Sequence, residues 1–258
     1  MTDSAARVAI LTGASSGIGY ALAERMKTDG WTLVIGSRRP EAAVARIRAI
    51  GGAGDVVAVP GDLANPQTAE ALIEAARKLG PVQALFLNHS GPAVKRFEQV
   101  TDDEWTAAFR LMVLGPLRLL HAALPLFREA GGGRVVAITS FVVKRPVSGS
   151  VVSSSLRAVL VNAIKTVAQE AGPDGILLNA VAPGYIATER LLAWIGAQSA
   201  VAGTNEKEST AAATNSVPLR RFGQPEAVAE LVAFLLSPRN TYITGQQILI
   251  DGGLVVES

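Results

Sequence analysis

The chain has no cysteine, and it is poor in histidine and in aromatic residues. Its 258 residues include two His, three Tyr and three Trp, and aromatic side chains make up 5% of the sequence. The absence of cysteine excludes disulfides, thiolate zinc sites and cysteine nucleophiles. Two histidines do not suggest a histidine-rich centre, so no metal site is expected. With so few aromatic residues, the core has to be built from Ala, Val, Leu and Ile.

Charge is also scarce. Charged residues make up 18% of the chain, and 24 Lys and Arg stand against 22 Asp and Glu, which gives a net charge of +2. Nucleic-acid binding needs clustered basic charge, and no run of Lys and Arg exceeds two residues. Residues 1–6 lack the basic and apolar regions of a signal peptide. No apolar run approaches the roughly 18 residues needed to span a bilayer. We therefore expect a cytoplasmic protein without nucleic-acid or membrane partners.

Short β-branched segments alternate with helical patterns along almost the whole length. Val8 to Thr12 is a continuous apolar run, typical of a strand covered on both faces. Alternation of strands and helices favours a parallel sheet with helices on both sides. The sequence predicts an α/β fold, with one doubly wound, seven-stranded parallel sheet in a single domain over residues 1–258. The expected strands are 8–12, 33–37, 56–59, 84–87, 134–139, 176–181 and 247–250.

One connection is unusually long. Roughly forty residues separate the strand ending near Ala182 from the helix that opens at Pro225. Such a connection in a compact domain is usually functional or has helices of its own. Residues 191–195 and 206–213 show helical patterns, so a substrate lid is predicted at about residues 184–216.

A glycine-rich loop joins the first strand to the first helix. The loop reads Thr-Gly-Ala-Ser-Ser-Gly-Ile-Gly over residues 12–19. Glycines let the backbone approach a pyrophosphate, whose charge is met by the amides that open the next helix. The alternative is an ordinary turn. The residues predicted to contact a dinucleotide here are Gly13, Ser15, Ser16, Gly17, Ile18 and Gly19.

This loop resembles that of the short-chain dehydrogenase/reductase family, and further family motifs follow in order. They are Asp62-Leu63, Asn88-His89-Ser90-Gly91, Ser140, the segment 179–184, Gly245-Gln246 and Asp251-Gly252-Gly253. Together they cover nearly the whole chain and are similar to those of 3-oxoacyl-carrier-protein reductases. The resemblance implies a Rossmann-type fold and assembly into a dimer or tetramer through the helices around 101–127 and 153–171 and the C-terminal strand. It also implies further cofactor contacts from Asp62, Leu63, Asn88, Gly91, Arg157, Pro183, Gly184, Ile186 and Thr188.

The end of the second strand bears on the choice of cofactor. An NAD site usually has an acidic residue there, which accepts hydrogen bonds from the ribose 2′-hydroxyl. This chain instead has Ser37-Arg38-Arg39. A guanidinium can grip a 2′-phosphate bidentately, whereas a carboxylate would repel it. NADP(H) is therefore favoured over NAD(H), the alternative being a solvated arginine pair that leads into a helix.

The expected catalytic residues depart from the family pattern. Family enzymes use a Ser, a Tyr and a Lys, with an Asn earlier in the chain. Ser140 matches the Ser, but the Tyr and Lys positions hold Ser153 and Arg157, and the Asn position holds Met112. A phenol has a pKa of about 10 and an aliphatic hydroxyl is a much weaker acid, so Ser153 is a poor proton donor. Arg157 can hold ribose hydroxyls but does not release a proton as lysine does.

Other residues near the expected site have two interpretations each. Tyr185 is either a replacement acid or an aromatic wall of the pocket. His89 has a pKa range suited to proton transfer, or it is a hydrogen-bonded structural residue. Ser140 either holds a substrate carbonyl or bonds the local backbone. The hydroxyl-rich segment 148–155 either binds a polar ligand or forms a turn and helix cap.

These observations leave three functional hypotheses. The first is an NADP(H)-dependent oxidoreductase acting on a small carbonyl or alcohol, with an atypical active site. The second is a catalytically inactive NADP(H)-binding sensor or partner subunit, because fold and chemistry need not occur together. The third is a redox-neutral lyase or isomerase. The catalytic residues predicted for the first are Ser140, Ser153, Arg157 and Tyr185.

Overall fold

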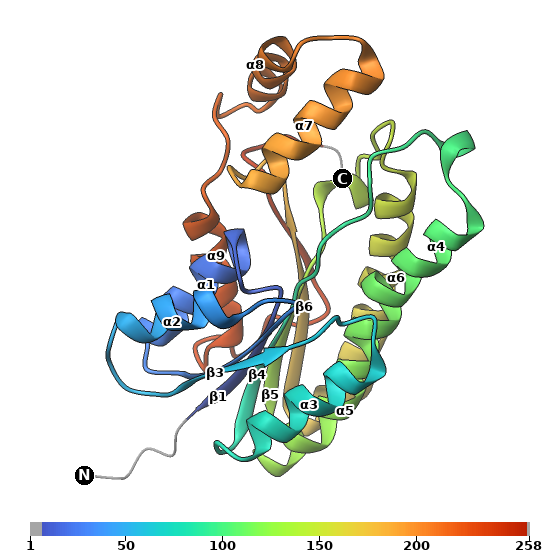
Figure 1. Ribbon diagram of the computed structural model, residues 1–258. Helices are drawn as coiled ribbons and strands as arrows, with labels where there is room; N and C mark the ends of the chain where they lie inside the picture. The colour runs from blue at the N-terminus through green and yellow to red at the C-terminus, as the bar shows by residue number, and fades with distance from the viewer. Residues whose placement is uncertain (1–6, 257–258) are drawn as a thin grey trace.

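Seven parallel strands form one sheet in the computed structural model, which describes residues 7–256 (Figure 1). The strand order is β3-β2-β1-β4-β5-β6-β7. The predicted doubly wound α/β fold is thereby confirmed. The strands are β1 (Val8–Thr12), β2 (Thr32–Ser37), β3 (Val56–Pro60), β4 (Val82–Leu87), β5 (Gly133–Ile138), β6 (Ile176–Pro183) and β7 (Gln247–Ile250).

Helices cover both faces of the sheet, and alternate residues of β1 point to the two layers. Ala9 and Leu11 belong to one buried cluster, whereas Val8 and Ile10 belong to the other. Both clusters consist mainly of aliphatic residues, as the composition requires. In Figure 1, α1, α2 and α9 lie on one side of the sheet and α3, α5 and α6 on the other. Their bounds are α1 (Gly17–Thr28), α2 (Glu41–Ala49), α3 (Pro66–Arg77), α5 (Gly115–Glu129), α6 (Val151–Ala171) and α9 (Pro225–Leu236).

The carboxyl ends of the strands meet at one edge, where the order reverses between β1 and β4. Ligands of open α/β sheets bind at such a switch point. Here the two strand ends are tied together: the Asn88 backbone N–H donates to Thr12 Oγ1 at 2.9 Å, and Asn88 Nδ2 donates to the Gly13 carbonyl at 3.0 Å. The glycine loop and the segment after β4 are thus held next to each other.

Two helices occupy the long connection after β6. They are α7 (Glu189–Ala202) and α8 (Glu206–Ser216), each longer than its predicted core. Thr188 caps α7 through its side chain, which accepts a hydrogen bond from the Leu191 backbone N–H. Both helices stand beyond the carboxyl edge of the sheet in Figure 1.

Two helical stretches nevertheless pass a test of length and composition for membrane spans. They are residues 102–129 and 151–174. The first includes α4 (Asp102–Phe109), a π-helical turn (Arg110–Leu114) and α5. Both stretches are partly buried, and core helices of soluble proteins pass the same test. The expectation about a signal peptide concerns residues 1–6, which lie outside the described residues.

Candidate functional site

A cleft of about 760 Å³ opens at the carboxyl edge beside β1, β2 and β4. This volume lies within the range of ligand-binding clefts. The cleft brings together most of the residues predicted to bind a cofactor. They are Gly13, Ser15, Ser16, Gly17, Ile18, Ser37, Arg38, Arg39, Asp62, Leu63, Asn88 and Thr188.

The other predicted cofactor residues lie elsewhere. Arg157, Pro183, Gly184 and Ile186 line a second, smaller cavity next to the cleft. Gly91 lines a third cavity. Gly19 is not among the residues that line these three cavities.

Close packing explains two glycines of the loop. Gly13 has a φ of 60°, and a Cβ there would lie 2.8 Å from the Asn88 carbonyl oxygen. A Cβ on Gly19 would collide with the Gly13 carbonyl. Both positions therefore require glycine, Gly13 for its conformation as well as its space. These glycines therefore let the loop pack closely on itself and on the segment after β4.

The residues at the end of β2 give the cleft a basic region with polar groups that have no partner in the described part of the chain. Arg38 and Arg39 are exposed, and neither forms an ion pair within residues 7–256. The Ser37 hydroxyl is buried and has no hydrogen-bond partner there. Arg46 from α2 adds a third guanidinium to the lining, with its Cζ 4.4 Å from the centre of the Tyr20 ring. A phosphate with an adjacent hydroxyl would suit these groups.

The second cavity, of about 180 Å³, adjoins the cleft under α7. It contains the predicted catalytic residues Ser140, Ser153, Arg157 and Tyr185. The cleft and this cavity share five lining residues, which are Ile18, Asn88, His89, Thr188 and Arg190. A ligand in the cleft can therefore reach a small molecule in the cavity.

Ser153 and Arg157 lie one helical turn apart on α6 and contact each other. Arg157 Nε donates to Ser153 Oγ at 3.2 Å. Arg157 Nη1 donates to the Ile138 and Thr139 carbonyls at 3.1 and 2.9 Å, which ties α6 to the end of β5. Burial and the nearby charge of Arg190 lower the pKa of Arg157 to about 10. At neutral pH Arg157 remains a cation, and three hydrogen bonds hold its guanidinium group in place.

Met112 lies in the π-helical turn before α5 and is buried. It belongs to a small apolar cluster with Val152 and Leu156 of α6. Its side chain thus serves packing between the two helices, and a thioether has no proton to donate.

Ser140 and two serines of the hydroxyl-rich segment 148–155 bond to nearby backbone groups. Ser140 Oγ accepts from the Val142 backbone N–H at 3.4 Å. Ser150 Oγ donates to the Val147 carbonyl at 2.6 Å, and Ser154 Oγ donates to the Ser150 carbonyl at 3.0 Å. Ser140 and Ser150 nevertheless line the cavity, so their oxygens remain next to any bound molecule.

Tyr185 packs in an aromatic group with Phe141 and Trp194. Its ring centroid lies 5.3 Å from that of Phe141 and 5.7 Å from that of Trp194. Burial raises the pKa of Tyr185, and the charge of Arg145 opposes this only in part. A phenol with a raised pKa is a weaker acid, so the environment favours the role of an aromatic wall.

His89 is buried between the cleft and the cavity. Its Nδ1 lies 2.7 Å from the Ser90 carbonyl, which can only accept, so Nδ1 carries the proton and Nε2 is a bare acceptor. Nε2 is buried without a partner among the described residues. Burial, followed by the charge of Arg157, lowers the pKa of His89 to about 3. His89 is therefore neutral at physiological pH and cannot act as a proton donor.

The low pKa of His89 predicts a loss of stability in acid. Below its usual pKa of 6.5 the histidine of the unfolded chain takes up a proton, whereas the folded protein resists protonation down to about pH 3. Stability should therefore fall as the pH drops from about 6.5 toward 3, by about 1.4 kcal/mol per pH unit from this residue. Urea unfolding of wild type and His89→Asn between pH 7 and 5 measures the difference in slope.

The control for this prediction is His121→Gln, because His121 lies exposed on α5. That variant should keep the wild-type pH dependence, whereas His89→Asn should lose the part due to His89. Equal slopes in wild type and His89→Asn would show that His89 is not held neutral in the folded protein.

Several lining residues escaped prediction from the sequence, among them Arg46, Arg190 and Trp194. Arg46 is the sixth residue of α2, which begins at Glu41. Arg190 and Trp194 are one turn apart on α7 and face the cavity together. Their helix was expected, but its rotation over the cavity was not.

Within residues 7–256, no group of three or more His, Asp and Glu side chains could hold a metal ion. The residues of the cleft instead fit a phosphate-bearing organic ligand, through backbone amides and guanidinium groups.

Comparison with known proteins agrees with this geometry. The family model described as Enoyl-(Acyl carrier protein) reductase matches residues 13–255. The chain is 32% identical to a 3-oxoacyl-[acyl-carrier-protein] reductase of Synechocystis, with 99% of this chain and 100% of the relative covered. It is 29% identical to the NADPH-dependent reductase BacG of Bacillus subtilis, with 96% and 97% covered.

A solved structure of a reductase also matches this chain over almost its full length. L-sorbose reductase from Gluconobacter frateurii, complexed with NADPH and L-sorbose, superposes with a TM-score of 0.91 at 28% identity, covering 98% of each chain. The sheet order, the glycine loop and these likenesses over almost the full length agree. The chain belongs to the short-chain dehydrogenase/reductase family.

Proposed function

We propose that the protein is an NADPH-dependent oxidoreductase that interconverts a small carbonyl compound and its alcohol. The observation that carries this proposal is the pair of joined cavities, one of dinucleotide size and one of about 180 Å³. The relatives named above are reductases, and two of them are named or solved with NADPH. The smaller cavity suits a small substrate because little more than one compact molecule fits in it.

The preference for NADP(H) over NAD(H) rests on charge at the end of β2. Arg38, Arg39 and Arg46 surround this part of the cleft, and the buried Ser37 hydroxyl lacks a partner. A 2′-phosphate would accept hydrogen bonds from these groups. The carboxylates that line the cleft, Asp62 and Glu189, do not follow β2, so no acid stands where NAD sites usually have one.

We also propose that the active site is atypical, with Ser153 and Arg157 at the positions of the family Tyr and Lys. When bound, NADPH supplies the hydride to the carbonyl carbon, and one proton completes the alcohol. Arg157 holds positive charge close to the cavity, and Ser140 and Ser153 offer hydroxyls to the carbonyl oxygen. Since neither His89 nor Ser153 is an effective acid, we infer that the proton comes from water. The site therefore suits substrates that need little acid assistance.

The test is NADPH consumption by the purified protein with a panel of ketones, aldehydes, 2-oxo acids and enones. The expected result is turnover with at least one class, together with NADPH binding by calorimetry. NADPH binding with no turnover across the panel would favour a non-catalytic sensor or partner subunit. The neutral state of His89 and the raised pKa of Tyr185 are the observations that keep that second function in view. Absence of NADPH binding would contradict both.

We propose further that the protein is a cytoplasmic homo-oligomer, either a dimer or a tetramer. Support comes from apolar side chains left exposed on the helices of one face. Phe109 and Leu114 are each 38% exposed, and Val159 is 44% exposed. Light scattering after size-exclusion chromatography would give the mass, and a monomer would contradict this proposal.

A further inference from the structure

The smaller cavity has an unbalanced positive charge. Its lining contains two guanidinium groups, Arg157 and Arg190, and no Asp or Glu. Neither arginine takes part in an ion pair in the described part of the chain. Arg157 is buried, whereas Arg190 is exposed, and burying a charge such as that of Arg157 without a counter-charge is costly. The arrangement therefore favours an anion in or beside this cavity.

The two guanidinium groups converge on Gly91. Arg190 Nη1 lies 3.5 Å from the Gly91 carbonyl, a long and weak contact. A Cβ placed on Gly91 would collide with Nη2 of Arg190 and lie 3.6 Å from Nη2 of Arg157. The repulsion is reflected in the pKa of Arg157, which the charge of Arg190 lowers after burial has done so. A shared anion would stabilise two cations that converge on the same point.

The rest of the lining does not supply that anion. Arg157 uses Nε and Nη1 for neutral oxygens, and no hydrogen bond among the described residues engages its Nη2. His89 is neutral, with its buried Nε2 unpartnered. It thus adds an acceptor rather than a charge. The positive charge of the cavity therefore has no counter-charge among the lining residues, and a bound anion could supply one.

Apolar side chains of α7 line the cavity next to Arg190. Leu191 and Trp194 of α7 also line the cavity, and the Trp194 ring packs near Tyr185. A ligand that satisfies Arg190 would therefore have an anionic group next to an apolar or aromatic body. It would also hold the start of α7 against the segment after β4.

We infer that the substrate carries a carboxylate, which Arg190 binds directly while the buried charge of Arg157 adds to the attraction. This rests on the proposed function, since it names the substrate class of that site. A carbonyl compound with a carboxylate nearby, such as a 2-oxo acid, combines the two features. Arg190 is then the residue that selects acids over neutral carbonyl compounds. Because Arg190 also lines the cleft, the pyrophosphate of the cofactor is the competing anion.

The experiment compares acids with their neutral esters on protein saturated with NADP⁺, which cannot reduce them. Benzoylformate and pyruvate are titrated by calorimetry against methyl benzoylformate and methyl pyruvate. At least one acid is expected to bind about tenfold or more tightly than its ester. Arg190→Gln should abolish that preference, and its Kd for NADP⁺ is measured as well because Arg190 also lines the cleft. Arg190→Lys should keep part of the preference because it keeps the charge.

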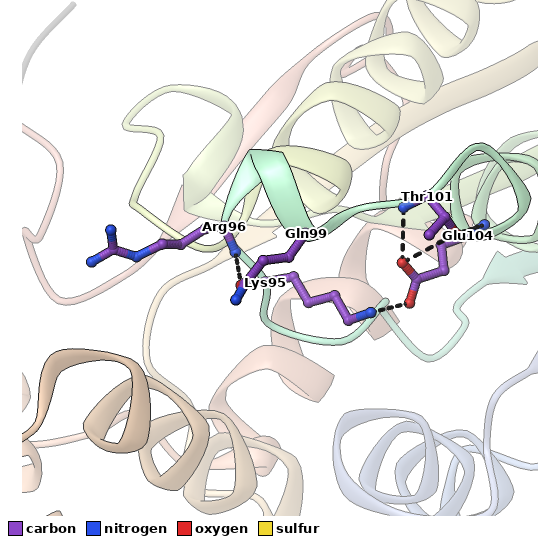
Figure 2. A network of polar contacts seen from close by, with 5 residues as sticks. All are labelled: Lys95, Arg96, Gln99, Thr101 and Glu104. Atoms are coloured by element: carbon purple, nitrogen blue, oxygen red, sulfur yellow. Dashed lines mark hydrogen bonds and ion pairs between the residues drawn. The ribbon is translucent and has the colours of Figure 1, made fainter.

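The matched control is Arg96→Gln, which removes one positive charge from an exposed residue outside the three cavities. In Figure 2 the Arg96 side chain extends away from the Lys95–Glu104 ion pair, and Arg96 bonds to Gln99 through its backbone N–H and carbonyl. This variant should bind acids as wild type does. Equal binding of acid and ester by wild type overturns the inference. So does a loss of NADP⁺ affinity in Arg190→Gln with the acid preference intact.

The same measurements separate this inference from the proposed function. Tight binding of an acid without NADPH consumption by any compound would remove the proposed function and leave the anion site. If the protein reduces neutral ketones but binds no acid more tightly than its ester, the proposed function stands and the carboxylate inference fails.

Discussion

The double variant Ser153→Tyr with Arg157→Lys is expected to reduce a neutral ketone about 10² to 10⁴ times faster than wild type in kcat/KM. That is the usual contribution of a positioned general acid. Position 153 lines the cavity and lies one turn before position 157, so a phenol there would point at the same space as the Ser153 hydroxyl. A lysine at 157 would place an ammonium beside the phenol, and a nearby cation lowers the pKa of a tyrosine. NADPH oxidation followed from pH 6 to 9 measures the gain.

The matched control is Ser155→Tyr with Arg157→Lys, because Ser155 is exposed and does not line the cavity. It carries the same lysine and adds the same phenol on the outer side of α6. Its rate should stay close to that of the single variant Arg157→Lys. Thermal unfolding checks that each variant folds, since the lysine has to replace the bonds of Arg157 to the Ile138 and Thr139 carbonyls. If both double variants gain equally, position 153 is not the place of the acid.

The pH dependence adds a second readout. In the wild-type cavity the pKa of His89 is about 3 and that of Tyr185 is raised, so neither changes charge between pH 6 and 9. The introduced tyrosine should bring a fall in rate at high pH, as its phenol loses its proton. A gain in rate with no change in the pH profile would indicate better packing of substrate rather than proton transfer.

The layers of the fold were predictable because apolar strand segments and helical patterns are local features of the sequence and alternate along the chain. The run from Val8 to Thr12 is apolar at every position, which a strand buried on both faces requires. All seven expected strands are present, with differences at their ends. β6 continues to Pro183, two residues beyond the expected end, because the ladder with β7 extends to the pair Pro183 and Ile250. Pairing with a distant strand is not visible in local composition.

The candidate site was predictable only in part, for a related reason. The four-residue spacing of Ser153 and Arg157 places them one helical turn apart, which agrees with their contact in the structure. The bonds from Arg157 to the carbonyls at the end of β5 depend on how α6 crosses the sheet. The approach of Arg190 to Gly91 joins residues 99 positions apart through the rotation of α7. Only the folded chain shows that two arginines share one cavity without an acid.

Removing the basic groups at the end of β2 is expected to reverse the preference for cofactor. The variant Arg38→Ala with Arg39→Ala should raise the Kd of NADPH about 100-fold and leave that of NADH nearly unchanged. A charge-assisted hydrogen bond contributes roughly 1.5–3 kcal/mol. Both arginines are exposed and screened by solvent, so the lower end applies to each. Two such bonds lost correspond to about two orders of magnitude in affinity.

The control for this variant is Arg239→Ala, which removes an exposed arginine that packs on Phe234 away from the cleft. It should bind both cofactors as wild type does, so a general effect of net charge can be separated from a contact. Salt adds a further check, because a phosphate held by exposed arginines should weaken as ionic strength rises, in wild type more than in the double variant. An equal loss of NADPH and NADH affinity would place these arginines against a part of the cofactor that the two forms share. In that case Arg46, which stands over Tyr20 in the same cleft, becomes the residue to test for the 2′-phosphate.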